Sequence, residues 1–178
     1  MRSAEPGRRA LLAAGRALLS TEDLTKLSVN AIAAEAKMAK GSFYQHWPSR
    51  EAYFVALHRA FHDDLDAKVT AAIAGLDPGP DRLAAGITAY LDGCLADPAT
   101  KGLLVQARTD AGLGPEVAAR NATAAALITA DLTAIGWQDP TPVATLLVAA
   151  IAETALHELT TTSPHPPLRE ALLRLATR

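Results

Sequence analysis

The chain has 178 residues, of which 49% are hydrophobic, 20% are charged and 4% are aromatic. This composition can bury a core and excludes a disordered chain, and the single cysteine, Cys94, excludes an internal disulfide framework or a zinc ribbon. Alanine fills about a fifth of the positions while strand-favouring residues are sparse, so a β-sandwich or barrel is excluded in favour of an all-α fold.

Charge is unevenly distributed along the chain. The first 50 residues contain eight basic and four acidic side chains, whereas residues 51–178 contain nine basic and fifteen acidic ones. A basic region at one end favours contact with a polyanion at that end alone. The N-terminal segment lacks the apolar core of a secretion signal, and the richest apolar run, residues 143–152, is shorter than a bilayer span. We therefore expect a cytoplasmic protein with no membrane contact.

Chain-breaking residues divide the sequence into about nine helix-sized segments, with no convincing strand. Apolar spacing, serine N-caps at positions 28 and 49, and a glycine C-cap at position 136 delimit these segments. The predicted helices cover residues 5–20, 29–36, 39–46, 50–75, 81–95, 103–111, 116–135, 142–159 and 166–177.

The predicted helix over residues 142–159 is apolar around most of its circumference. Such a helix must be covered on more than one side. In a chain of this size a second copy is the natural cover, with the 166–177 helix beside it, so we expect a homodimer. The alternative is a central core helix that needs no partner.

The most informative segment is Ser28 to Arg50, which reads S-V-N-A-I-A-A-E-A-K-M-A-K-G-S-F-Y-Q-H-W-P-S-R. It predicts two short helices joined by a tight turn, with small residues where they cross, which is a helix-turn-helix. Ile32, Met38 and Phe43 are expected to fill its core. The outward positions of the second helix are then Lys40, Gly41, Ser42, Tyr44 and His46, which suit phosphate and base contacts in a DNA major groove.

This segment resembles the DNA-binding domain of the TetR family of bacterial transcriptional regulators. The residues that match the family pattern in fixed register are Ser28, Ile32, Ala33, Ala36, Lys40, Gly41, Phe43, Tyr44, His46, Ser49 and Glu51. The resemblance implies a helix-turn-helix head over residues 1–48 and a helical ligand-binding and dimerisation domain over residues 49–178. It also implies phosphate contacts from Ser28, Tyr44, His46 and Arg50, with Lys40 and Ser42 closest to the bases.

Two departures from the family pattern lie in the turn. Lys37 stands where the family usually has glycine, so a residue with a side chain is expected at positive φ, at a cost of about 1 kcal/mol. Ala39 replaces the usual serine cap of the second helix, which costs about 1 kcal/mol. Lys37 also adds a cation, which we predict to contact a DNA phosphate.

The resemblance further implies that the C-terminal domain binds a small molecule that releases DNA. We take as candidate pocket residues those that interrupt apolar helix faces. They are His58, His62, Tyr90, Cys94, Gln106, Trp137 and His157. Alanine-rich walls with few cations favour a neutral, apolar effector, although each of these residues is equally explained by ordinary packing.

The sequence does not predict an enzyme or a cofactor. His58 and His62 have the spacing of a metal-binding pair, but no third ligand is identifiable, so we predict no metal. Nucleophile-elbow, phosphate-loop and dinucleotide-loop motifs are absent from the sequence. The main hypothesis is a ligand-responsive repressor that binds a near-palindromic operator as a dimer. The alternatives are a helical effector-binding dimer without DNA binding and a metal-dependent enzyme.

Overall fold

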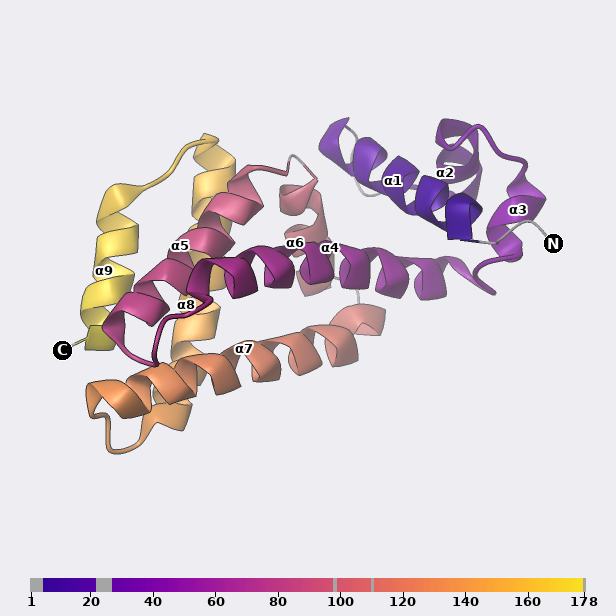
Figure 1. Ribbon diagram of the computed structural model, residues 1–178. Coiled ribbons are helices and arrows are strands. Elements are labelled where there is room, and N and C mark those ends of the chain that lie inside the picture. Colours follow the sequence, from indigo (N-terminus) through magenta and orange to yellow (C-terminus); the bar gives the residue numbers. More distant parts are fainter. Residues whose placement is uncertain (1–4, 22–26, 98, 110, 178) are drawn as a thin grey trace. The chain divides into compact units, whose positions relative to one another are not determined.

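The computed structural model describes residues 5–21, 27–97, 99–109 and 111–177. Over these residues the chain is helical and contains no strand (Figure 1), which confirms the predicted all-α class. The elements in chain order are α1 (Glu5–Thr21), α2 (Val29–Glu35), α3 (Lys40–Tyr44), α4 (Arg50–Ile73), α5 (Pro80–Leu95), α6 (Thr100–Thr109), the 3-10 helix η2 (Ala111–Leu113), α7 (Gly114–Ile135), α8 (Pro140–Thr161) and α9 (Pro166–Thr177).

Several predicted helix ends need correction. Helix α3 ends at Tyr44 rather than at residue 46, and Gln45 is its C-cap. Helix α6 begins at Thr100 instead of residue 103, and its last predicted residue belongs to η2. Helix ends are the least certain part of any prediction from local signals.

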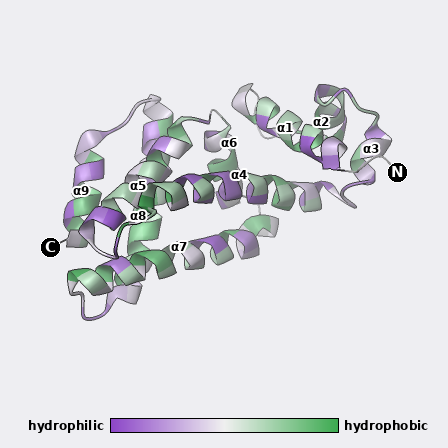
Figure 2. Ribbon diagram, viewed as in Figure 1, coloured by the Kyte–Doolittle hydropathy of each residue, from purple (hydrophilic) through white to green (hydrophobic). Residues whose placement is uncertain are grey.

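Helix α8 is longer than the apolar run that marked it. It spans 22 residues and is long and apolar enough to cross a membrane by length and composition, so the prediction that this segment is too short was wrong. In Figure 2 hydrophobic residues predominate between its polar ends. The core helix of a protein that never enters a membrane passes the same test, and 39% of the relevant window is buried here. Helix α8 is therefore only weak evidence for a membrane-spanning segment.

The chain forms two compact units. The first comprises residues 1–63 and 98–114, and the second comprises residues 64–97 and 115–178. In the first unit α1 packs against α2, α3 and α6, and α2 packs against α3. In the second unit α5, α8 and α9 lie side by side (Figure 1). The functional boundary predicted after residue 48 remains a prediction.

The core of the first unit is centred on Tyr53, at the start of α4. Its ring lies 5.1 Å from that of Phe43 and 5.0 Å from that of Trp47, measured between centroids. Its hydroxyl donates to the carbonyl oxygen of Leu11 at 2.8 Å. Tyr53 thus joins α1, the α3 segment and α4, and burial raises the pKa of its hydroxyl.

Buried ion pairs join helices of the second unit. The Glu158 carboxylate in α8 accepts hydrogen bonds from Arg169 Nε and Nη2, both at 2.7 Å, and from the His165 backbone N–H at 2.8 Å. Asp131 in α7 accepts from Arg82 Nε at 2.7 Å and from the Gly79 N–H at 3.0 Å. Burial alone would raise the pKa of Glu158, but the hydrogen bonds from Arg169 and His165 hold it below its usual value.

Candidate functional site

Helix α2 begins as its sequence predicts. The Ala31 N–H donates to Ser28 Oγ at 3.1 Å, and Ser28 itself has extended backbone, which is the geometry of an N-cap. Ile32 and Ala33 are buried on the inner side of the helix. The small side chain of Ala33 lets the next helix cross closely, as the helix-turn-helix interpretation requires.

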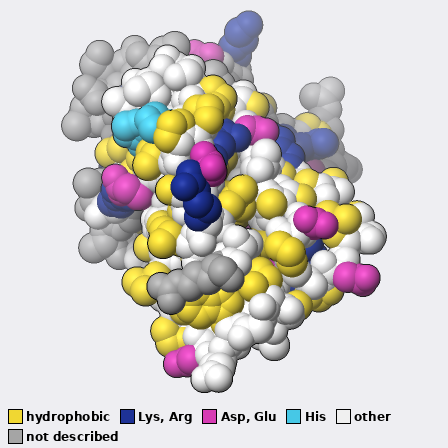
Figure 3. All heavy atoms as spheres, turned by 90° about the vertical axis from the view of Figure 1, so that its left-hand side faces the viewer, with side chains coloured by type: hydrophobic (Ala, Val, Ile, Leu, Met, Phe, Trp, Pro, Cys, Tyr) yellow, Lys and Arg dark blue, Asp and Glu magenta, His cyan; other side chains and the backbone are white. Residues whose placement is uncertain are grey.

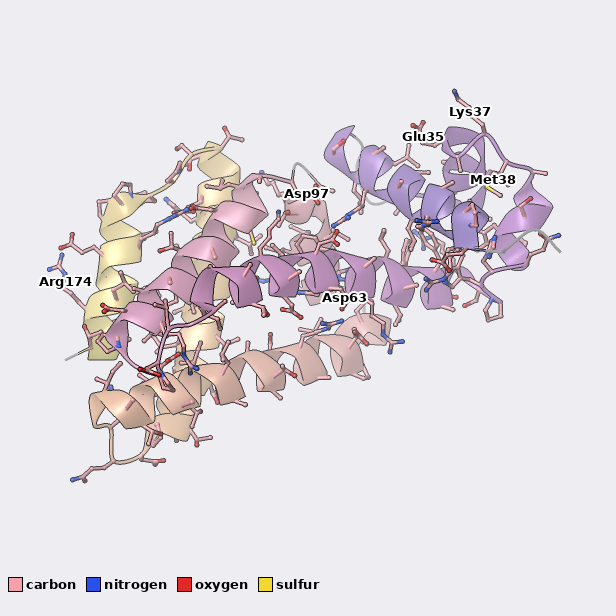
Figure 4. All side chains as sticks on the ribbon, in the orientation of Figure 1. Glu35, Lys37, Met38, Asp63, Asp97 and Arg174 are labelled. Atoms are coloured by element: carbon pink, nitrogen blue, oxygen red, sulfur yellow. The ribbon has the colours of Figure 1, made fainter. Side chains whose placement is uncertain are left out.

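The turn between α2 and α3 holds Lys37 in a left-handed conformation. Its φ is 55°, which confirms the prediction of a positive φ at this non-glycine position. The Met38 N–H donates back to the Ala33 carbonyl oxygen at 2.9 Å and closes the turn. Figure 4 shows the Lys37 side chain pointing away from the helices, so its charge is open to solvent.

Helix α3 presents polar positions outward and one aromatic ring inward. Phe43 is fully buried, whereas Lys40, Gly41 and Tyr44 are exposed. Ser42 is half-buried, and a side chain added at Gly41 would meet no atom within 4 Å. Ala39 occupies the N-cap position without a side-chain hydrogen bond, as predicted.

Two of the predicted phosphate contacts also make internal contacts. A Cβ added at Gly7 in α1 would lie 3.0 Å from His46 Nε2, so the half-buried imidazole rests against the first turn of α1. Arg50 Nε donates to the Leu27 carbonyl oxygen at 2.9 Å, and its guanidinium lies 4.3 Å from the centroid of the Phe54 ring. These contacts hold both side chains in place, and their DNA roles remain predictions.

The predicted pocket residues do not form one cluster within either unit. His58 and His62 belong to the first unit, as does Gln106, whose side chain lies outside the described ones. Tyr90, Cys94, Trp137 and His157 belong to the second unit. Trp137 Nε1 donates to the Ala176 carbonyl oxygen at 2.9 Å, and the His157 ring packs edge-on against that of His165 at 4.8 Å between centroids.

Tyr90 and Cys94 form a polar pair one turn apart in α5. Cys94 is fully buried and Tyr90 is half-buried on the same face of the helix. Burial raises the pKa of both groups, and that of the Cys94 thiol reaches about 12. A buried thiol with a raised pKa stays protonated at neutral pH, which disfavours its action as a nucleophile.

His58 and His62 differ in their surroundings despite their metal-like spacing. His58 is buried and His62 is half-buried, with ring centroids 6.4 Å apart. Within the described part of the chain, no group of three histidine, cysteine, aspartate or glutamate residues could hold a metal ion. The pair therefore has no identified third ligand among those residues.

Sequence reasoning missed a contact between α1 and the segment that follows α3. The Arg8 guanidinium in α1 lies 5.5 Å from the centroid of the Trp47 ring. The two residues are far apart in sequence and share no helical register, so only their basic and aromatic character could have suggested the pair.

Comparisons with known proteins agree with this geometry. Residues 11–57 match the family model described as bacterial regulatory proteins, tetR family. An uncharacterized HTH-type transcriptional regulator of Mycobacterium tuberculosis is 29% identical over 133 residues, covering 75% of this chain and 65% of the relative. The match thus spans slightly less than two thirds of that relative's length.

Solved structures extend the likeness to the whole chain. A transcriptional regulator from Rhodococcus sp. RHA1 aligns with a TM-score of 0.76 at 23% identity, over 95% of this chain and 93% of that one. The multidrug binding protein EbrR, complexed with imidazole, aligns with a TM-score of 0.76 at 26% identity, over 95% and 94% of the two chains. Reduced NemR of E. coli aligns with the same TM-score at 21% identity, over 96% and 95%.

The family match, the helix-turn-helix geometry and the shared fold agree. Residues 11–57 therefore resemble the DNA-binding region of the bacterial regulatory proteins of the tetR family, and the remaining helices share the fold of solved transcriptional regulators.

Proposed function

We propose that this protein is a transcriptional regulator that binds double-stranded DNA by placing α3 in the major groove. The observation that carries the proposal is the arrangement of α3. Phe43 fixes its inner side in the core while Lys40, Gly41 and Tyr44 are left exposed. A short helix held this way is the usual means of presenting side chains to base edges.

The proposed contacts divide by chemistry. Lys40 and Ser42 are proposed to lie nearest the bases, and Gly41 lets the backbone approach the DNA closely. Phosphate contacts are proposed for Ser28, Lys37, Tyr44, His46 and Arg50. Phosphate contacts set affinity and register, so loss of any one should weaken binding to all sequences alike.

We propose that the protein acts as a homodimer on a near-palindromic operator. Leu146 in α8 and Leu175 in α9 are 71% and 58% exposed, and a second copy that covered them would remove this apolar surface from water. Figure 3 shows further hydrophobic side chains, interspersed with charged ones, on the face that includes α9. A two-fold dimer presents two recognition helices to two half-sites about one DNA turn apart.

We also propose that a small molecule controls the release of the protein from DNA. In this proposal the protein is cytoplasmic and represses transcription until the small molecule binds. The second unit supplies one polar pair, Tyr90 and Cys94, for a neutral and apolar effector. The fold neighbour EbrR is described as a multidrug binding protein, which supports a small-molecule effector by analogy. Release requires that the effector bind one conformation more tightly than the other.

The test is binding of the purified protein to DNA from the upstream region of its own gene, at low and at physiological salt. We expect selective binding that weakens steeply as salt rises. Lys40→Ala should abolish selectivity, whereas Lys101→Ala, which removes an exposed lysine from α6, should preserve it. A selection from genomic fragments would find a distant operator. Failure of both assays would favour the effector-binding dimer without DNA binding.

A further inference from the structure

The first turn of α1 brings a basic side chain against the segment that follows α3. The Arg8 guanidinium lies 5.5 Å from the centroid of the Trp47 ring. The preceding residue, Gly7, lies so close to His46 that an added Cβ would be 3.0 Å from the imidazole Nε2. The His46 and Trp47 ring centroids are 5.6 Å apart. Arg8 and the proposed phosphate contact His46 are therefore neighbours around one indole ring.

The indole ring of Trp47, on which Arg8 rests, is held in place by the core. Trp47 is 5% exposed and packs against Phe43 and Tyr53, with centroid distances of 5.7 Å and 5.0 Å. A guanidinium that rests on an aromatic ring keeps its charge and its N–H donors while losing much of its freedom. Less conformational entropy is then lost when the guanidinium meets a ligand.

The charge of Arg8 is not neutralised within the described part of the chain. No ion pair joins its guanidinium to a carboxylate of the described residues. Two other arginines of the protein show the opposite arrangement, because Arg82 pairs with Asp131 and Arg169 pairs with Glu158. An immobilised and unneutralised guanidinium has the properties of an anion-binding group.

We propose that Arg8 is a further DNA contact, in which its guanidinium donates to a backbone phosphate beside the one held by His46. This inference rests on the proposed DNA-binding function. The family model begins at residue 11, so the resemblance assigns no role to Arg8. The contact contributes affinity and register and carries no base specificity.

The adjacent Arg9 provides a matched control. Arg9 is exposed, lies on the same turn of α1 and carries the same charge. Arg8→Gln and Arg9→Gln therefore change net charge and helix propensity equally, but only the first removes the group that rests on Trp47. Arg8→Lys restores the charge without the planar stack.

The experiment measures affinity against salt concentration for a duplex enriched by the wild-type protein from a random-sequence DNA pool. Arg8→Gln should lower the magnitude of the log–log salt slope by about 1 for each bound protomer, and should weaken selected and unselected duplexes by the same factor. Arg9→Gln should leave the slope within error of wild type, and Arg8→Lys should recover most of it. Thermal unfolding of each variant shows that the compared proteins are folded.

Each other result overturns the inference. Equal slopes for Arg8→Gln and wild type, with a lowered melting temperature, would assign the arginine to packing on Trp47 alone. Equal losses for Arg8→Gln and Arg9→Gln would replace a specific contact with general electrostatic attraction. Both results require a wild-type protein that binds DNA. Absence of wild-type binding would instead refute the proposed function, and this inference with it.

Discussion

The cores of the two units differ in their side-chain composition. Of the eight aromatic residues, six lie between positions 43 and 61, in the first unit. The second unit contains only Tyr90 and Trp137, and its helices are joined instead by buried ion pairs centred on Glu158 and Asp131. The first unit thus adds ring packing to its apolar core, whereas the second unit adds buried ion pairs to a core of aliphatic side chains.

This difference has consequences for how each unit responds to conditions. Contacts between apolar rings are insensitive to pH and little affected by salt. Buried ion pairs depend on the protonation of their carboxylates and become costly when one partner is lost. We expect the first unit to keep its internal geometry under conditions that loosen the second unit.

The largest expected effect is that of Arg169→Met. It would leave the fully buried Glu158 carboxylate without its main partner, and breaking a buried pair in this way costs about 4 kcal/mol of unfolding free energy. Arg174→Met is the matched control, because Arg174 lies in the same helix and pairs with Glu170 at 2.8 Å on the exposed surface. We expect a loss below about 0.5 kcal/mol there. Urea unfolding measures both, and similar losses would refute the buried-pair account.

The same pair predicts a pH dependence. The folded-state pKa of Glu158 is lowered, so its contribution to stability is fully present above the ordinary value of 4.5 and is lost as the pH falls through the folded-state value. Wild type should therefore lose unfolding free energy in acid, and its advantage over Arg169→Met should shrink there. A constant difference between the two proteins across the acid range would contradict this assignment.

The next effect tests ring packing in the first unit. A Cβ on Gly15 would clash with the Tyr53 hydroxyl oxygen, so Gly15→Ala should cost about 3 kcal/mol through overpacking. Tyr53→Phe should cost about 1 kcal/mol, since it removes only the hydrogen bond to Leu11. In the double variant the clash is relieved, so the cost of Gly15→Ala should fall by at least about 1 kcal/mol.

Gly86→Ala is the control for the glycine substitution. A Cβ at this helical position would meet Ile73 at 3.5 Å, which is ordinary contact, so the variant should be neutral or stabilised by up to about 1 kcal/mol. Denaturant unfolding of the four Gly15 and Tyr53 combinations gives the coupling energy. Strict additivity would show that the hydroxyl and Gly15 do not constrain each other.

The features that the sequence predicts correctly depend on neighbours in the chain. The Ser28 and Ser49 caps form as expected, and Gly136 ends α7 at a φ of 103°. The positive φ of Lys37 followed from the motif register in the same way. The proposed DNA contacts were open to prediction for this reason, because they lie within the single segment 28–50.

Features that join distant segments were not predicted. Arg169 reaches Asp92 across 77 positions, and Arg82 reaches Asp131 across 49, with no shared periodicity to indicate either pair. The candidate pocket residues are those that interrupt an apolar helix face with a polar group. Trp137 is one of them, and its indole N–H donates to the Ala176 carbonyl oxygen within the fold. Polarity on an apolar face therefore identified structural partners as readily as ligand contacts.

The smallest expected effect concerns Lys37, where conformation and charge have opposite consequences. Lys37→Gly should relieve the left-handed backbone and stabilise the head by about 1 kcal/mol, while weakening DNA binding by removing a proposed phosphate contact. Lys37→Gln keeps the cost of the left-handed backbone and removes only the charge. It should therefore weaken DNA binding as much as Lys37→Gly does, without the gain in stability. If Lys37→Gly binds DNA as tightly as wild type while Lys37→Gln does not, backbone relief compensates for the lost charge. If both bind as wild type, the turn cation has no part in DNA recognition.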